Sequence, residues 1–107
     1  MISVCRTVCY TISKTDAEQV SRRRTTGPEI AARIKTGEWP LGAQAHVGAT
    51  IVEGDVFPLV VVRVDSGLNT VNGQVLLDGN DVLYVVGVKE HLGKGGRAGC
   101  WHWPARD

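Results

Sequence analysis

Three consecutive arginines form the densest group of side chains in this chain that could bind a ligand. Arg22, Arg23 and Arg24 stand together, and Arg33 and Lys35 follow within a few residues. Guanidinium groups grip phosphate oxygens in pairs, so such a cluster could bind a nucleotide or a nucleic acid. Successive residues of a helix fan around its axis, so the three arginines cannot all face one ligand. The alternative interpretation is a solvated helix end, where cations suit the helix dipole.

A glycine-rich basic segment, GKGGRAG at residues 93–99, is a second candidate for ligand binding. It combines backbone N–H groups with the cations Lys94 and Arg97. Its spacing differs from that of a nucleotide-hydrolysing phosphate loop, no Ser or Thr follows the glycines, and no helix is expected after it. We therefore predict a flexible binding loop here rather than a hydrolase site.

The aromatic segment near the C-terminus offers a different kind of surface. In a strand, Trp101 and Trp103 lie on one face and His102 points to the other. A pair of indole rings could stack nucleic-acid bases. In a small domain with few other aromatic residues, tryptophans more often belong to the core, and we expect this for at least one of the two. Trp101 is nevertheless a candidate contact residue for a binding partner.

Cys5, Cys9, Cys100 and His102 are four side chains that could together bind structural zinc. The gap between Cys5 and Cys9 falls within the range of known sites. Buried free thiols are common in folded proteins, however, and the odd number of cysteines argues against a secreted disulfide framework. We therefore expect the protein to bind no metal and no other cofactor. We also expect it to reside in a reducing compartment.

No arrangement typical of catalysis is visible in the sequence. His46, His91 and His102 are scattered, and no Ser or Cys lies in a nucleophile elbow. The aspartates of the second half fall in expected turns, where turn geometry alone favours them. We therefore expect a protein that is not an enzyme.

The length of 107 residues suits a single domain, which we place over residues 1–107. The formal net charge is +1, so the charge of the whole molecule predicts no polyanionic partner. The ends are basic and the middle is acidic, which could orient a partner or could be a solvated distribution without a binding role. No apolar run is long enough to cross a membrane, and the N-terminus does not resemble a signal peptide. We expect a cytosolic protein without membrane contact.

The first third of the chain predicts a short strand and one or two helices. Residues 1–12 form an N-terminal extension or a short strand with alternating apolar side chains. Residues 13–37 form a helical segment. Its first helix can be capped by Ser13 or Thr15 and stops near Gly27. A second short helix, PEIAARIKT, follows it.

Residues 43–104 predict a small antiparallel β domain of about five strands. Strand 56–64 looks the most buried. Pro58 within it should lie at a bulge, an edge or the strand start. If this strand were left at a sheet edge, it would invite a homodimer. Two apolar, β-branched runs flank Asp78-Gly79-Asn80-Asp81, so residues 70–90 predict a β-hairpin. The fold class is therefore α+β, with an SH3-like barrel after the helices and a five-stranded roll as the alternative.

Several segments together resemble a family of small uncharacterised proteins encoded by tailed bacteriophages and prophages. They are Arg22-Arg23-Arg24, Gln44-Ala45-His46-Val47-Gly48, Gly54-Asp55 with Pro58, and the block from Val71-Asn72-Gly73-Gln74-Val75 to Asp81. The similarity begins near Thr11, so Cys5 and Cys9 lie in an extension outside it. The family supplies no catalytic residues to carry over. The resemblance implies an accessory phage protein that acts in the host bacterial cytoplasm.

From this context we expect a non-enzymatic protein that binds and blocks a host factor, above all a component of an anti-phage defence system. Its partner would be a host protein or a nucleotide signal. The candidate binding residues are Arg22, Arg23, Arg24, Arg33, Lys94, Arg97 and Trp101. The alternatives are a nucleic-acid-binding small barrel, acting as a regulator or packaging accessory, and a structural or decoration protein of the virion. The near-neutral charge argues against nucleic acid.

Overall fold

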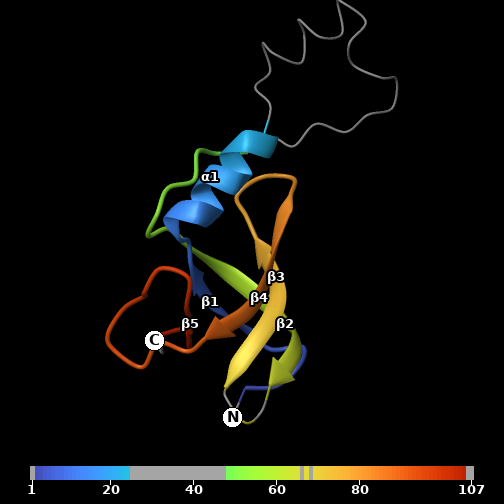
Figure 1. Cartoon of the computed structure of the whole chain (residues 1–107), viewed down its shortest axis with the longest axis vertical. Coiled ribbons are helices and arrows are strands. Elements are labelled where there is room, and N and C mark those ends of the chain that lie inside the picture. Colours follow the sequence, from blue (N-terminus) through green and yellow to red (C-terminus); the bar gives the residue numbers. More distant parts are fainter. Residues whose placement is uncertain (1, 25–47, 66, 68, 106–107) are drawn as a thin grey trace, which may run out of the picture.

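The computed structural model describes residues 2–24, 48–65, 67 and 69–105. They form one helix and five strands: β1 (Thr7–Thr11), α1 (Lys14–Arg23), β2 (Val56–Asp65), β3 (Thr70–Leu76), β4 (Val82–Lys89) and β5 (Trp101–His102). Figure 1 shows α1 at one end of the β sheet. The described residues thus form a small α+β domain, as the sequence predicts.

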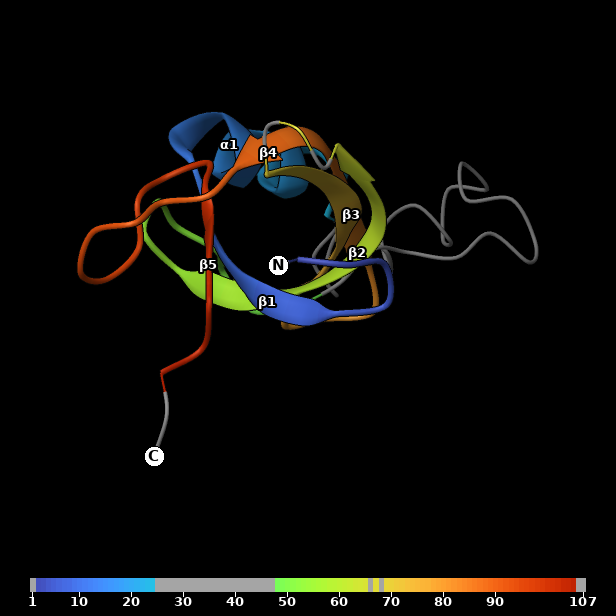
Figure 2. The ribbon, with the colours of Figure 1, turned by 90° about the horizontal axis from the view of Figure 1, so that it is seen from below.

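The five strands form one antiparallel sheet in the order β4-β3-β2-β1-β5. The sheet curls into a half-barrel, which Figure 2 shows from one end. Just beyond β4, Glu90 forms a parallel bridge with Trp101. The backbone N–H of His91 donates to the carbonyl of Trp101 at 2.9 Å. The two outermost strands are therefore joined at one end of the sheet.

The hairpin predicted over residues 70–90 is confirmed as β3 and β4. Leu76 pairs with Val82, and the Asp-Gly-Asn-Asp sequence lies in the connection between them. Farther along the hairpin the register shifts, and there Gly87 has a φ of 66° and donates its N–H to Asn72 Oδ1 at 2.8 Å. This bulge bends the hairpin, and it supports the curl of the sheet.

Strand β1 and the start of α1 are also as predicted. Val8 and Tyr10 are buried on one face of β1. The Ser13 hydroxyl accepts a hydrogen bond from the Asp16 N–H, and the Asp16 carboxylate accepts one from the Ser13 N–H, each at 3.1 Å. This capping box satisfies two backbone donors at the start of the helix. The Tyr10 hydroxyl donates to the same carboxylate and so links β1 to α1.

The helix is shorter than the sequence predicts. α1 ends at Arg23 instead of near Gly27, because Arg24 is already extended, with a φ of −82° and a ψ of 141°. The Arg24 N–H still donates to the Val20 carbonyl at 3.1 Å. The Arg24 side chain contacts residues far along the chain, and no local helix pattern contains that information.

Strand β2 settles one conditional expectation about residues 56–64 and corrects another. It lies in the middle of the sheet, so it has no free edge that could recruit a second copy. It is also only half-buried: Leu59 and Val61 fill the core, whereas Val56 and Val62 are exposed. The reason is that alternate residues of a strand point to opposite faces, and one face of this sheet is open in the described structure.

The position of Pro58 follows from its missing N–H. It is the third residue of β2 and lies opposite Cys9 of β1. Pairing between β2 and β3 begins only at Leu59, so no hydrogen bond to β3 is required of the proline nitrogen. Of the three locations predicted for Pro58, a bulge, an edge or the strand start, the structure shows a position near the strand start.

The core lies inside the curled sheet. Its largest fully buried side chains are Trp101, Ile12, Leu59, Val8, Val20, Val61, Val71 and Val75. Val20 is the only buried residue of α1, so the helix meets the core along one face. The second predicted helix and the start of the β domain predicted over residues 43–104 lie outside the described residues, which resume at Gly48, where it bridges Gly79.

Candidate functional site

Two of the three consecutive arginines are engaged within the protein. The carboxylate of Asp81, which is buried, accepts hydrogen bonds from both of them. Arg24 donates from Nη2 to Oδ1 at 2.7 Å and from Nε to Oδ2 at 3.1 Å, and Arg23 donates from Nε to Oδ2 at 3.3 Å. Arg24 also donates to the Ala49 carbonyl, and Arg23 to the Val82 carbonyl at 2.6 Å. We call Arg23, Arg24 and Asp81 the arginine clamp, because they fasten the end of α1 to the β3–β4 connection.

The arginine clamp is electrostatically satisfied. The hydrogen bond from Arg24 is the largest cause that lowers the pKa of Asp81, and the charges of Arg24 and Arg23 add to it against the opposing effect of burial. A partner of Arg24 would have to compete with this buried carboxylate, whereas the side chain of Arg23 is 30% exposed and is held through two of its three nitrogens. From the sequence, turn geometry alone explained the presence of Asp81. Nothing in its local sequence distinguishes an aspartate that only shapes a turn from one that also binds a distant arginine.

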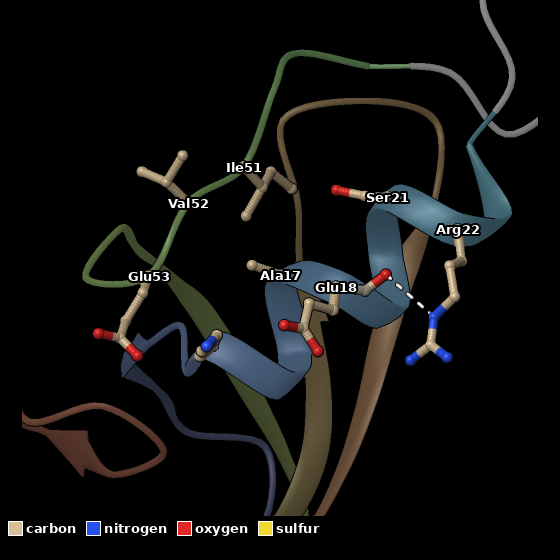
Figure 3. A pocket seen from close by; sticks show the side chains of 8 residues that line it. Ala17, Glu18, Ser21, Arg22, Ile51, Val52 and Glu53 are labelled. Carbon is tan, nitrogen blue, oxygen red and sulfur yellow. Dashed lines mark hydrogen bonds between the residues drawn. The ribbon is translucent and has the colours of Figure 1, made fainter.

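Arg22 is the member of the triplet that remains available. Its Nε donates to the Glu18 carbonyl one turn earlier at 3.3 Å, and it forms no ion pair with another described residue. Figure 3 shows Arg22 at the edge of a groove between α1 and residues 51–53. Arg33, the other candidate of this basic region, lies outside the described residues.

This groove, which we call the helix groove, has an apolar floor and a charged rim. Ala17, Ile51 and Val52 supply its apolar atoms, and Val52 is 55% exposed. The remaining lining residues are Lys14, Glu18, Ser21, Arg22 and Glu53, around a volume of about 600 Å³. The rim carries two cations and two anions, so it suits a protein segment with its own mixed charges better than a polyanion.

The glycine-rich loop, residues 93–99, is anchored on β1 and stands out from the sheet in both Figure 1 and Figure 2. The Gly99 N–H donates to the Thr11 carbonyl at 2.8 Å. Gly96 approaches the same residue so closely that a β-carbon at this position would lie 2.0 Å from the Thr11 hydroxyl oxygen. Lys94 and Arg97 are exposed, and neither forms an ion pair with a described residue.

A second hollow, which we call the loop cavity, lies between the glycine-rich loop and β5. It has a volume of about 340 Å³ and is lined by Glu90, His91, Leu92, Gly93, Gly95, His102, Trp103 and Ala105. The sequence did not single out its members Glu90, Leu92 and Ala105. They come together because residues 91–100 loop out and return to the point where Trp101 bridges Glu90.

The two C-terminal tryptophans have different roles. Trp101 is fully buried, and its Nε1 donates to the Asn69 carbonyl at 3.2 Å, which confirms the expected core position. Trp103 is 40% exposed, and its ring meets that of Trp101 edge to face, with centroids 5.4 Å apart and planes at 85°. Perpendicular rings form no flat platform for successive bases. Trp101 therefore presents no surface to a partner in this structure, whereas Trp103 does.

The four side chains considered for zinc do not assemble. Cys9 and His102 are cross-strand neighbours in β1 and β5, whereas Cys5 is exposed. Across the described ranges, no group of three or more Cys, His, Asp or Glu side chains is arranged to hold a metal ion.

No protein-family model, curated protein or solved structure matches this chain. The described part of the chain contains no helix that is long and apolar enough to cross a membrane. The helix groove, the glycine-rich loop and the loop cavity are the features of the described residues that could bind a partner or a ligand.

Proposed function

We propose that this chain is a non-enzymatic accessory protein of a bacteriophage that binds and blocks a host protein in the bacterial cytoplasm, a component of an anti-phage defence system. The phage context rests on the resemblance of several sequence segments to small phage and prophage proteins. The single observation that supports a protein partner is the helix groove, where exposed apolar atoms are framed by charges of both signs.

The composition of the helix groove favours a protein segment as its occupant. Val52 exposes an apolar side chain that an apolar residue of a partner could cover, with a gain of roughly 25 cal/mol for each Å² removed from water. Arg22 and Glu53 at the rim can pair with opposite charges on the partner, which would set its orientation more than its affinity.

The engagement of Arg23 and Arg24 in the arginine clamp weakens the nucleic-acid alternative. Phosphate contacts dominate the affinity of such proteins, and two of the expected contacts are committed to Asp81. For the architecture we propose a small barrel of the SH3-like kind. The five-stranded curled sheet and the bridge between Glu90 and Trp101 support this assignment.

A test compares two charge-matched double variants in bacterial strains that each carry one defence system. Arg22→Glu with Val52→Asp alters the helix groove, whereas Val62→Asp with Arg63→Glu makes the same charge change on the exposed face of β2. Val62 is 46% exposed, close to the value for Val52, so the control is also matched in exposure. The measurement is the plating efficiency of a sensitive phage when each protein is expressed in the defended and undefended strains.

We expect the wild-type protein and the β2 variant to restore plating in one defended strain, and the groove variant to restore none. Thermal unfolding of all three proteins checks that they are folded. Equal restoration by the wild-type and groove variants would overturn the groove as the binding surface. Absence of restoration by the wild-type protein in every defended strain would overturn the proposed function itself.

A further inference from the structure

We propose that the loop cavity binds a mononucleotide-like ligand, a planar heteroaromatic ring that carries a phosphate group. The loop cavity shares no lining residue with the helix groove, so the two sites are separate. Its volume of about 340 Å³ lies at the lower end of the range of small-ligand pockets, roughly 300–1,000 Å³, which suits one nucleotide rather than a chain of them.

The first observation behind this proposal is an imidazole without a protein partner. His102 lines the loop cavity, and its Nδ1 atom is buried with no hydrogen-bond partner among the described residues. The Thr11 hydroxyl oxygen, on the neighbouring strand β1, is also buried without a hydrogen-bond partner among the described residues. Buried polar atoms in native proteins are nearly always hydrogen-bonded, so the imidazole nitrogen of His102 needs a bound water or a ligand atom as its partner.

The second observation concerns the groups that could hold a heteroaromatic ring. Trp103 offers a partly exposed indole to the loop cavity, and a ligand ring would stack on the part of it that Arg6, 5.9 Å from the ring centroid, leaves open. Stacking on an aromatic side chain is a contact that every base can make, because each has a π-face. Glu90 and His91 also line the loop cavity, and a carboxylate and an imidazole can hydrogen-bond the polar edge of a base.

The third observation concerns the groups that could hold an anion. Gly93 and Gly95 bring the backbone of the glycine-rich loop to the wall of the loop cavity. The N–H groups of residues 93–96 donate to no acceptor in the described part of the chain. Gly95 has a φ of 71°, and alternation of right- and left-handed backbone can aim successive N–H groups at one anion. Lys94 and Arg97 add two exposed positive charges to the same loop.

The experiment is a titration of the full chain, followed by backbone and indole N–H signals in NMR spectra. The probes are adenosine monophosphate, adenosine and inorganic phosphate. We expect adenosine monophosphate to shift the Trp103 indole signal and the amide signals of Gly93–Gly96, and to bind at least tenfold more tightly than either part alone. Trp103→Ala, Lys94→Ala and Arg97→Ala should each weaken binding about five- to tenfold. Arg63→Ala, which removes an exposed arginine from β2, should change it less than twofold.

Three results would overturn the proposal. The first is no change in these signals at millimolar adenosine monophosphate. The second is equal binding of adenosine, because the loop would then recognise no phosphate. The third is full competition by inorganic phosphate without a shift of Trp103, because the loop cavity would then hold only an anion. The spectra themselves show whether each variant is folded, so a lost fold cannot be mistaken for lost binding.

Discussion

Arg24 and Asp81, which are 57 residues apart in the chain, are joined by two hydrogen bonds of 2.7 Å and 3.1 Å. The side chain of Arg24 is 10% exposed and that of Asp81 is 1% exposed, so the pair is shielded from water. It connects the end of α1 to the connection between β3 and β4. The same arginine would be free to bind phosphate if α1 ended on a solvated surface.

Loss of either partner of this pair should destabilise the protein. Arg24→Ala leaves the buried carboxylate of Asp81 with only Arg23, and removal of one partner of a buried pair costs about 3–5 kcal/mol. We expect a loss of roughly 3 kcal/mol in the free energy of unfolding, measured by urea denaturation. Arg22→Ala, two residues earlier and exposed, is the control and should cost less than about 0.5 kcal/mol. Equal losses in the two variants would contradict the structural role of Arg24.

The stability that the arginine clamp contributes should disappear in acid. The pKa of Asp81 is lowered in the folded protein, chiefly by its hydrogen bond with Arg24. The contribution is therefore complete above the unfolded-state value of about 3.9 and is lost as the pH falls through the lower folded-state value. We expect the difference in unfolding free energy between the wild-type protein and Asp81→Asn to shrink below about pH 4. A difference that stays constant down to pH 2 would argue against an ionised Asp81 in the clamp.

Tyr10 should have the opposite dependence on pH. Burial is the largest cause that raises the pKa of this phenol, and the neighbouring Asp16 raises it further. A raised folded-state pKa means that the contribution to stability is complete below the unfolded-state value of about 10 and is lost as the pH rises above it. Tyr10→Phe removes the hydroxyl and should cost about 1 kcal/mol at pH 7. Alkaline unfolding followed by circular dichroism should start at a higher pH in this variant than in the wild type.

The two tryptophans of the C-terminal segment should differ sharply when each is truncated. Trp101→Ala opens a cavity in the core and should cost about 3–5 kcal/mol, enough to unfold a marginal domain. Trp103→Ala removes a partly exposed ring and should cost about 1 kcal/mol or less. Thermal unfolding of both variants measures the difference. Similar losses would show that Trp103 is as much a part of the core as Trp101.

Gly73 marks a point where two strands approach closely inside the curled sheet. A β-carbon at this position would lie 2.4 Å from the Val60 carbonyl oxygen and 2.5 Å from Leu59 Cδ1. Gly73→Ala should therefore cost more than about 2 kcal/mol, because the backbone of β2 must move. Gly67→Ala is the matched control, since its nearest atom is a side-chain oxygen of Asp65 at 3.7 Å. Urea denaturation of the two variants should separate them clearly.

The sequence by itself determined the local elements of this protein. Alternation of apolar residues predicted β1, the Asp-Gly-Asn-Asp turn predicted the β3–β4 hairpin, and Ser13 was one of two candidate caps for α1, with Thr15. These features depend on residues within a few positions of one another, where turn geometry, capping and strand alternation act directly.

Only the tertiary structure decided which candidate residues are free to bind. It placed Asp81 against Arg23 and Arg24, Trp101 in the core, and Trp103 beside His91 and the glycine-rich loop. It also placed β2 in the centre of the sheet, so the condition under which this strand would recruit a second copy is not met. Local sequence does not encode these outcomes, because each depends on which distant segments the curl of the sheet brings into contact.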